Sequence, residues 1–168
     1  MRGQTSLRGL EFYNPESVGT FDRIYQSQDY PNVFLGGQDD LNQLPRPACQ
    51  IFDVSKTLPE PKEWTELTFE QVKPQFDDLV QKLTNVISTT DCPVFVHCIA
   101  GQNRSPAVLA SALSKLTGRG VLDILREMKQ QRANIGPHDP YLYLATNSSP
   151  YENEAIKTEM FSRLSTID

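Results

Sequence analysis

The sequence has no apolar run approaching the ~18 residues that a membrane-spanning helix needs. It also has no excess of basic residues, since 16 Lys and Arg stand against 21 Asp and Glu, for a formal net charge of −5. Nucleic-acid and membrane-surface binding both need a basic patch, so this balance argues against both partners. Residues 1–20 lack the apolar core of a secretory signal, so we expect none there.

Cysteine is scarce, with only Cys49, Cys92 and Cys98 in the chain. An odd, small number of cysteines makes no paired framework, which predicts free thiols and a reducing compartment such as the cytoplasm. A secreted effector without a standard signal would have the same composition, so that alternative stays open. A cysteine beside an apolar run usually packs in the core, and we predict that role for Cys49 and Cys92.

The length of 168 residues suits one domain, and 38% apolar with 22% charged residues is typical of a globular chain. Apolar runs predict strands over 32–37, 48–54, 65–69 and 94–98. Helical periodicity predicts helices over 74–88, 105–116, 121–132, 139–145 and 148–164. Strands that alternate with helices indicate an α/β fold, with a mostly parallel central sheet flanked by helices. We assign residues 21–168 to this domain and residues 1–20 to a flexible arm.

The stretch "HCIAGQNRS" (97–105) ends a buried strand and opens a helix. Strand, tight loop and helix form an anion-binding turn, because loop N–H groups and the helix N-terminus converge on one point. Gly101 lets the backbone curl closely around a ligand, and the planar fork of Arg104 binds two oxygens of a tetrahedral oxyanion. Cys98 opens the loop, where these dipoles and the positive charge favour its thiolate. A core-packing cysteine and a solvent-facing arginine are the plain alternatives.

These residue types predict a phosphate trap that contains a nucleophile. The Cys98 thiolate would attack phosphorus, and the loop donors would stabilise the charge on the equatorial oxygens. Ser105 would donate a hydrogen bond to the sulfur when it leaves, and His97 would orient the loop from behind. The predicted phosphate-binding residues are Ile99, Ala100, Gly101, Gln102, Asn103 and Arg104. The mechanism calls for no metal and no cofactor.

The stretch matches the signature of the cysteine-dependent protein tyrosine phosphatase superfamily: His-Cys, five residues, then Arg-Ser. "VFVHCIAGQNRSPAVLASALSKL" resembles the dual-specificity branch in particular, and so do "REMKQQRANIGPHDPYLYLA", "NVFLGGQDDL" and "CQIFDVS". The likeness covers about residues 30–146. It implies a dual-specificity phosphatase-like fold built around a strand, a phosphate loop and a helix. It also implies hydrolysis of phosphotyrosine, with phosphoserine and phosphothreonine as further substrates, through a phosphocysteine intermediate.

The chain departs from this family at the general acid. Such enzymes carry an aspartate upstream of the helix before the cysteine strand, but no aspartate lies between Asp53 and Asp77 here. Glu66 falls closest to the expected place and is our first candidate, with Glu70 next along the chain. Asp53 is the second candidate named for the role. An ordinary exposed carboxylate is an equal interpretation of Glu66, and Asp77 is expected to be solvated on a helix.

The variable positions of the loop carry no Lys or Arg, which disfavours an inositol polyphosphate or an RNA 5′ end as substrate. A singly phosphorylated protein is the expected partner, bound by a monomer. Two other functions stay open: a catalytically weak or inactive phospho-residue binding module, and a sulfurtransferase or arsenate reductase. We also predict that mild oxidation links Cys98 to Cys49.

Overall fold

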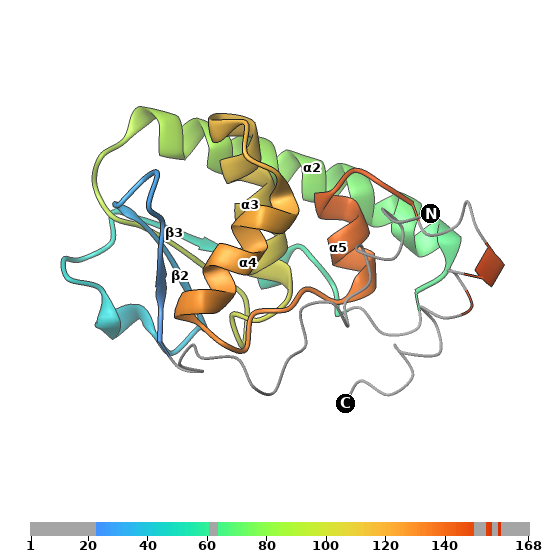
Figure 1. The fold of residues 1–168 in the computed structure, drawn as a ribbon, viewed down its shortest axis with the longest axis horizontal. Coiled ribbons are helices and arrows are strands. Elements are labelled where there is room, and N and C mark those ends of the chain that lie inside the picture. Colours follow the sequence, from blue (N-terminus) through green and yellow to red (C-terminus); the bar gives the residue numbers. More distant parts are fainter. Residues whose placement is uncertain (1–22, 61–63, 150–153, 156–157, 159–168) are drawn as a thin grey trace.

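A mixed four-stranded sheet forms the centre of the computed structural model, which describes residues 23–60, 64–149, 154–155 and 158 (Figure 1). Its strands are β1 (Tyr25–Gln26), β2 (Val33–Gly36), β3 (Gln50–Asp53) and β4 (Val94–His97), in the spatial order β1-β2-β4-β3. β2 and β3 both run parallel to β4, whereas β1 is antiparallel to β2. The predicted α/β class with a mostly parallel sheet is therefore confirmed. The short β1 was not predicted.

Four α-helices with defined bounds accompany the sheet within the described residues. They are α2 (Glu66–Thr89), α3 (Arg104–Thr117), α4 (Val121–Gln131) and α5 (Asp139–Ala145), and single 3-10 turns cover Leu41–Gln43 and Val54–Lys56. The predictions for α3, α4 and α5 agree with these bounds to within one residue. The expected arm over 1–20 lies outside the described residues, as does most of the expected helix over 148–164.

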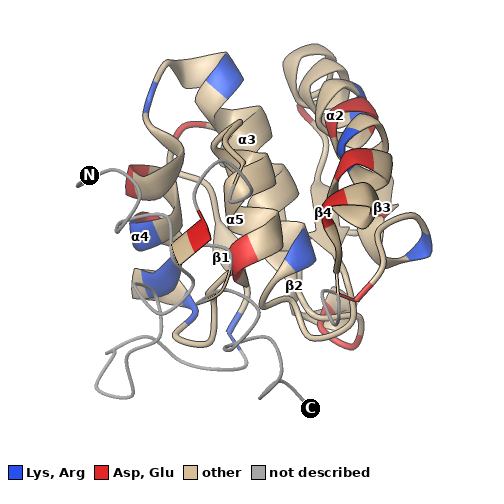
Figure 2. Ribbon diagram, turned by 90° about the vertical axis from the view of Figure 1, so that its right-hand side faces the viewer, with Lys and Arg blue, Asp and Glu red and all other residues tan. Residues whose placement is uncertain are grey.

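Helix α3 is the central helix of the domain, because it packs against α2, α4, α5 and the strands β2 and β4. Its ribbon is mostly free of charged residues, whereas α2 carries both acidic and basic residues (Figure 2). Nine of its residues are buried: Arg104, Ser105, Pro106, Ala107, Val108, Leu109, Ala110, Ala112 and Leu113. A helix that is buried on most sides holds its first turn in a fixed place, and that first turn carries the signature arginine.

Helix α2 corrects the prediction of a strand over 65–69 and a helix from residue 74. Thr65 caps the helix in a reciprocal hydrogen-bonded box with Thr68, so the helix begins at Glu66. Pro74 lies inside the helix on its exposed face, where water can satisfy the carbonyl that loses its partner. The alternation in "TELTF" is therefore one end of a helical pattern. Within the described residues, no helix is long and apolar enough to cross a membrane.

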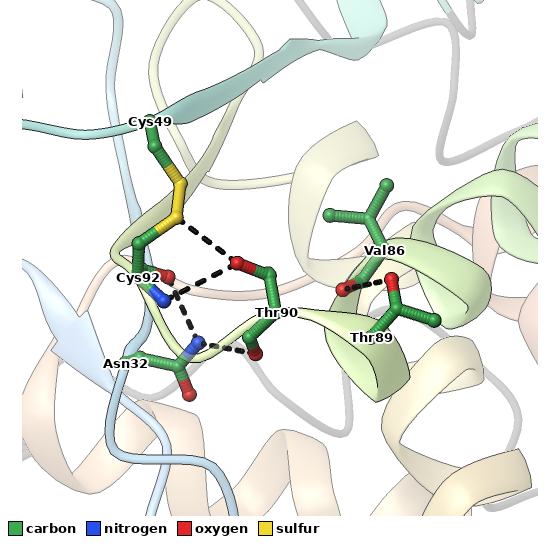
Figure 3. Close-up of a disulfide and its surroundings, with 6 residues drawn as sticks. All are labelled: Asn32, Cys49, Val86, Thr89, Thr90 and Cys92. Atoms are coloured by element: carbon green, nitrogen blue, oxygen red, sulfur yellow. Dashed lines mark hydrogen bonds between the residues drawn. A yellow bond between two sulfur atoms is a disulfide. The ribbon is translucent and has the colours of Figure 1, made fainter.

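The cysteines correct a second prediction. Cys49, just before β3, forms a disulfide with Cys92, just before β4, and their Cα atoms lie 6.1 Å apart (Figure 3). Thr90 Oγ1 lies 3.0 Å from the Cys92 sulfur, and Asn32 Nδ2 donates to the Cys92 carbonyl oxygen at 2.9 Å. Only Cys98 is a free thiol, so the expected three free thiols were wrong. Because β3 and β4 are parallel, the N-terminal ends of the two strands lie side by side, and so do the cysteines that precede them. The 43-residue separation of these cysteines in the sequence does not reveal this.

Candidate active site

The site lies at the carboxyl end of β4, where the cysteine loop (residues 98–103) leads into α3. His97, the last residue of β4, pairs in register with Gly36 of β2 and Asp53 of β3. The segments that follow these two strands therefore flank the loop. Ligand sites in parallel sheets commonly form outside the carboxyl ends of the strands, and the buried Cys98 opens this one.

The backbone of the cysteine loop is fixed by hydrogen bonds from outside it. The carbonyl oxygen of Ile99 accepts from Gln38 N at 2.9 Å, and that of Gln102 accepts from Gly136 N at 2.9 Å. His97 Nδ1 lies 2.9 Å from the Cys98 carbonyl oxygen, in keeping with its expected orienting role. These three carbonyl oxygens therefore have partners outside the loop.

Position 101 has no room for a side chain, so only glycine fits there. Its φ is +67°, a region that favours glycine. A Cβ placed on it would lie 2.4 Å from the carbonyl carbon and oxygen of Gly36 and 2.6 Å from Gly37 N. The cysteine loop therefore packs directly on the backbone of the turn after β2.

The Cys98 sulfur lies 3.2 Å from Ser105 Oγ in the first turn of α3, and both residues are almost fully buried. Burial by itself raises the pKa of this thiol. Hydrogen bonds from the Ser105 hydroxyl and from the N–H groups of Ser105 and Gly101, with the charge of Arg104, outweigh burial and leave the pKa of Cys98 below its ordinary value. The site therefore favours the thiolate form of Cys98.

Arg104 is 6% exposed and is held by the segment that precedes α2. One terminal nitrogen donates to the Leu58 carbonyl oxygen at 2.8 Å, and the other lies 3.3 Å from Glu60 Oε1. The Pro59 carbonyl accepts from the Tyr141 hydroxyl. Residues 58–60 are thus hydrogen-bonded to helices α3 and α5 beside Arg104.

Glu60 is the residue that sequence reasoning missed. Among the described carboxylates it is the one that contacts Arg104, and its backbone carbonyl accepts a hydrogen bond from Trp64 Nε1 at 2.8 Å. Its side chain is 68% exposed, so the carboxylate can move. The signal in the sequence was a lone carboxylate between two prolines in "LPEP", because proline restricts the backbone on both sides of it.

The other candidate acids lie in less suitable places. Glu66 has an exposed side chain in the first turn of α2, and Glu70 lies one turn further along the same helix. The Asp53 carboxylate accepts from Ser55 N at 3.1 Å and lies 3.9 Å from His97 Nδ1. Burial would raise the pKa of Asp53, but the hydrogen bonds from Ser55 outweigh it and lower the pKa. A carboxyl held in its ionised form is a poor proton donor.

His138 is a second residue at the site that the sequence did not single out. Its backbone N–H donates to Asn103 Oδ1 at 2.7 Å, which fixes the side chain of the last loop residue. Burial lowers the pKa of His138, and the nearby Glu60 opposes this to a smaller extent. Within the described part of the chain, no three His, Cys, Asp or Glu side chains are grouped to hold a metal ion.

The model of the family "Protein-tyrosine phosphatase" matches residues 56–144, more than half of the chain. Human dual specificity protein phosphatase 8 is 28% identical over 126 residues, which cover 67% of this chain and 20% of that protein. Human dual specificity protein phosphatase 16 is 27% identical over 128 residues, with 67% and 19% covered. The chain therefore spans about a fifth of the length of these curated relatives.

Two examples illustrate the solved structures that share the fold. The crystal structure of DUSP15 matches with a TM-score of 0.56 and 20% identity, covering 86% of this chain and 96% of that one. OH1 from the Orf virus, a tyrosine phosphatase, matches with a TM-score of 0.56 and 17% identity over the same shares. The likeness is of fold, and the family match covers α2, β4, the cysteine loop and α3 to α5. The chain belongs to the protein-tyrosine phosphatase family and, within it, to the dual-specificity-like branch.

Proposed function

We propose that this protein hydrolyses phosphotyrosine in proteins, with phosphoserine and phosphothreonine as further substrates, through a phosphocysteine intermediate. The observation that carries the proposal is the buried Cys98 sulfur, 3.2 Å from Ser105 Oγ at the N-terminus of α3, with its pKa lowered. A thiolate under an array of backbone donors is suited to in-line attack on phosphorus.

In the first step the Cys98 sulfur bonds to phosphorus while the bond from phosphorus to the substrate oxygen breaks. We assign the general acid to Glu60, which gives its proton to the leaving oxygen. The phosphoryl dianion competes with Glu60 for the guanidinium of Arg104, 3.3 Å away, so substrate binding frees the carboxyl. The 68% exposure of the Glu60 side chain supports this exchange.

In the second step water attacks phosphorus and Glu60 takes a proton from that water. The bond between phosphorus and sulfur breaks, and its electron pair returns to Cys98 as the thiolate. Ser105 donates to the sulfur as negative charge develops there. Inorganic phosphate then leaves, and no metal or redox partner enters the cycle.

Phosphotyrosine is the preferred class because of the rim of the cysteine loop. Ile99 keeps 47% of its surface exposed, which offers an apolar contact to an aromatic ring. Ala100, Gln102 and Asn103 add no positive charge for a second phosphate. A singly phosphorylated aromatic side chain therefore fits this rim better than a polyphosphate.

The test compares two substrates whose leaving groups differ in acidity. Glu60→Gln should lower kcat for a phosphotyrosine peptide about 10²- to 10⁴-fold, but much less for p-nitrophenyl phosphate, whose leaving phenolate needs little protonation. The basic limb of the pH profile should flatten in the same variant. Glu66→Gln and Asp53→Asn are the matched controls and should leave the ratio of the two rates unchanged. Cys98→Ser should abolish turnover of both.

The second candidate function is a catalytically weak or inactive phospho-residue binding module. It is favoured by the missing aspartate between Asp53 and Asp77. No turnover by wild type, together with measurable binding of a phosphotyrosine peptide, would establish it. The family match leaves the sulfurtransferase or arsenate reductase alternative without support.

We place this activity in a monomer in the cytoplasm. The Cys98 nucleophile must remain reduced to act, and a reducing compartment maintains it. The Cys49–Cys92 disulfide means that three free thiols no longer support this placement, and it makes a more oxidising compartment the alternative that fractionation would reveal. Subcellular fractionation and the elution volume on a sizing column test the two statements.

A further inference from the structure

Arg132, at the end of α4, is 3% exposed and has no role in the proposed reaction. Its guanidinium group donates four hydrogen bonds. Nε donates to the Gly101 carbonyl oxygen at 3.2 Å, and one terminal nitrogen donates to the Ala100 carbonyl oxygen at 2.7 Å. The other terminal nitrogen contacts Asp40 Oδ2 at 3.1 Å and the Arg23 carbonyl oxygen at 2.8 Å. These donors face the outer side of the cysteine loop.

Peptide geometry relates these outer bonds to the inner face of the loop. In a planar trans peptide the C=O of one residue and the N–H of the next point in opposite directions. Drawing the Ala100 and Gly101 carbonyls toward Arg132 therefore turns the N–H groups of Gly101 and Gln102 the other way. The Gly101 N–H indeed forms a hydrogen bond that lowers the pKa of the Cys98 thiol.

Asp40 holds the guanidinium in place from the opposite side. Its Oδ2 also accepts from Gly37 N at 2.8 Å, in the turn against which Gly101 packs. A buried arginine charge needs such a partner, and Asp40 supplies it with a side chain that is itself only 16% exposed. The ion pair thus clamps the turn after β2 to the apex of the cysteine loop.

The four carbonyls of residues 99–102 differ in what donates to them, and this difference shows why the Arg132 side chain matters for the shape of the loop. Ile99 and Gln102 receive their hydrogen bonds from backbone N–H groups, which most substitutions would preserve. Ala100 and Gly101 receive theirs from Arg132. Lys at position 132 would keep the charge but lose the planar fork that reaches two carbonyls and a carboxylate together.

We infer that Arg132, braced by Asp40, is a positioning residue that holds the backbone N–H groups of the cysteine loop toward the bound oxyanion. The inference deepens the proposed function and rests on its anion site, though not on turnover. Arg132 does not touch the phosphate or the sulfur, because its donors bind Ala100, Gly101, Asp40 and Arg23.

The experiment measures oxyanion binding and cysteine reactivity in Arg132→Lys. Tungstate binding is followed by isothermal titration calorimetry, and the pKa of Cys98 by its alkylation rate against pH. Arg119→Lys is the matched control. Arg119 also forks between two carboxylates, Asp29 at 2.7 Å and Glu127 at 3.1 Å, but beyond the opposite end of α3.

Arg132→Lys should weaken tungstate binding about tenfold or more, because at least one charge-assisted hydrogen bond is lost. The pKa of Cys98 should rise toward that of an ordinary cysteine, and kcat/KM should fall about 10²-fold. Arg119→Lys should match wild type in all three. A folded Arg132→Lys that binds tungstate within twofold of wild type, with an unchanged Cys98 pKa, overturns the inference.

If Arg132→Lys fails to fold, Asp40→Asn provides the second test. It keeps Arg132 and should shift tungstate affinity and Cys98 reactivity in the same direction by a smaller amount. Wild-type values in a folded Asp40→Asn would overturn the inference, as would a wild-type protein with neither tungstate binding nor a lowered Cys98 pKa. Wild type that binds tungstate but hydrolyses no phosphoester would refute the proposed phosphatase alone.

Discussion

Breaking the Cys49–Cys92 disulfide should destabilise the fold while leaving the candidate active site intact. The bond joins positions 43 residues apart. A loop of that length restricts the unfolded chain enough to contribute about 4 kcal/mol at 25 °C in the chain-entropy model. For a domain of this size, that corresponds to a fall in Tm of about 8–16 °C. Such a loss is a large part of the stability of a typical domain.

Urea unfolding with and without the reductant TCEP measures this effect. Trp64, the only tryptophan, is buried and packs edge-on against Tyr141 with ring centroids 5.1 Å apart, so its fluorescence reports the unfolding of the core. The double variant Cys49→Ser/Cys92→Ser is the control, because TCEP should not change its curve. Below the lowered Tm, TCEP should leave phosphatase turnover unchanged or higher, since it keeps Cys98 reduced.

Thiol counting gives an independent check. Denatured protein should show one free thiol before reduction and three after it, in line with the single free cysteine of the fold. Coincident unfolding curves with and without TCEP, together with three free thiols before reduction, would refute the reasoning. Coincident curves with one free thiol before reduction and three after it would show that the disulfide forms without stabilising the fold, which would refute the predicted loss of stability.

Four other predictions concern the cysteine loop and helix α3, which follows it. Ser105→Ala removes a donor to the Cys98 sulfur, so the pKa of Cys98 should rise, the acidic limb of kcat/KM should move to higher pH, and kcat should fall about tenfold. Gly118→Ala, at φ +79° with no atom near the new Cβ, should cost about 1 kcal/mol in urea unfolding. Gly101→Ala should cost more than that and should also lose tungstate binding, because its Cβ would collide with the Gly36 backbone; equal costs would contradict this. Mild peroxide should oxidise Cys98 without linking it to either other cysteine, and a cross-linked peptide found by mass spectrometry would contradict this.

The cysteine loop could be predicted because its chemistry is local. Cys98, Gly101, Arg104 and Ser105 lie within eight consecutive residues between a strand and a helix, so their spacing alone implies a shared anion site. The Cys98–Ser105 contact follows from that spacing. The fold class followed from alternating apolar patterns in the same way, apart from the two-residue β1, which is too short to show a pattern.

The residues that hold the loop could not be predicted, because they come from distant parts of the chain. Glu60 meets Arg104 across 44 positions, and Asp40 meets Arg132 across 92. Neither pair shares a helix face or a strand, so no periodic pattern links its members. The strand expected over 65–69 failed for a related reason: its five residues carry two threonines whose side chains cap a helix rather than pair across a sheet.

Strand β4 explains how one chain keeps a reactive thiolate and a disulfide apart. Cys92 precedes the strand and Cys98 follows it. Val94–His97 alone spans about 10 Å in extended conformation, whereas a disulfide needs Cα atoms within about 7 Å of each other. Exchange between the two would require β4 to leave the sheet, where β2 and β3 pair with it on both sides. The expected Cys98–Cys49 bridge was therefore wrong, since Cys49 is bonded to Cys92 at the opposite end of β4 from Cys98.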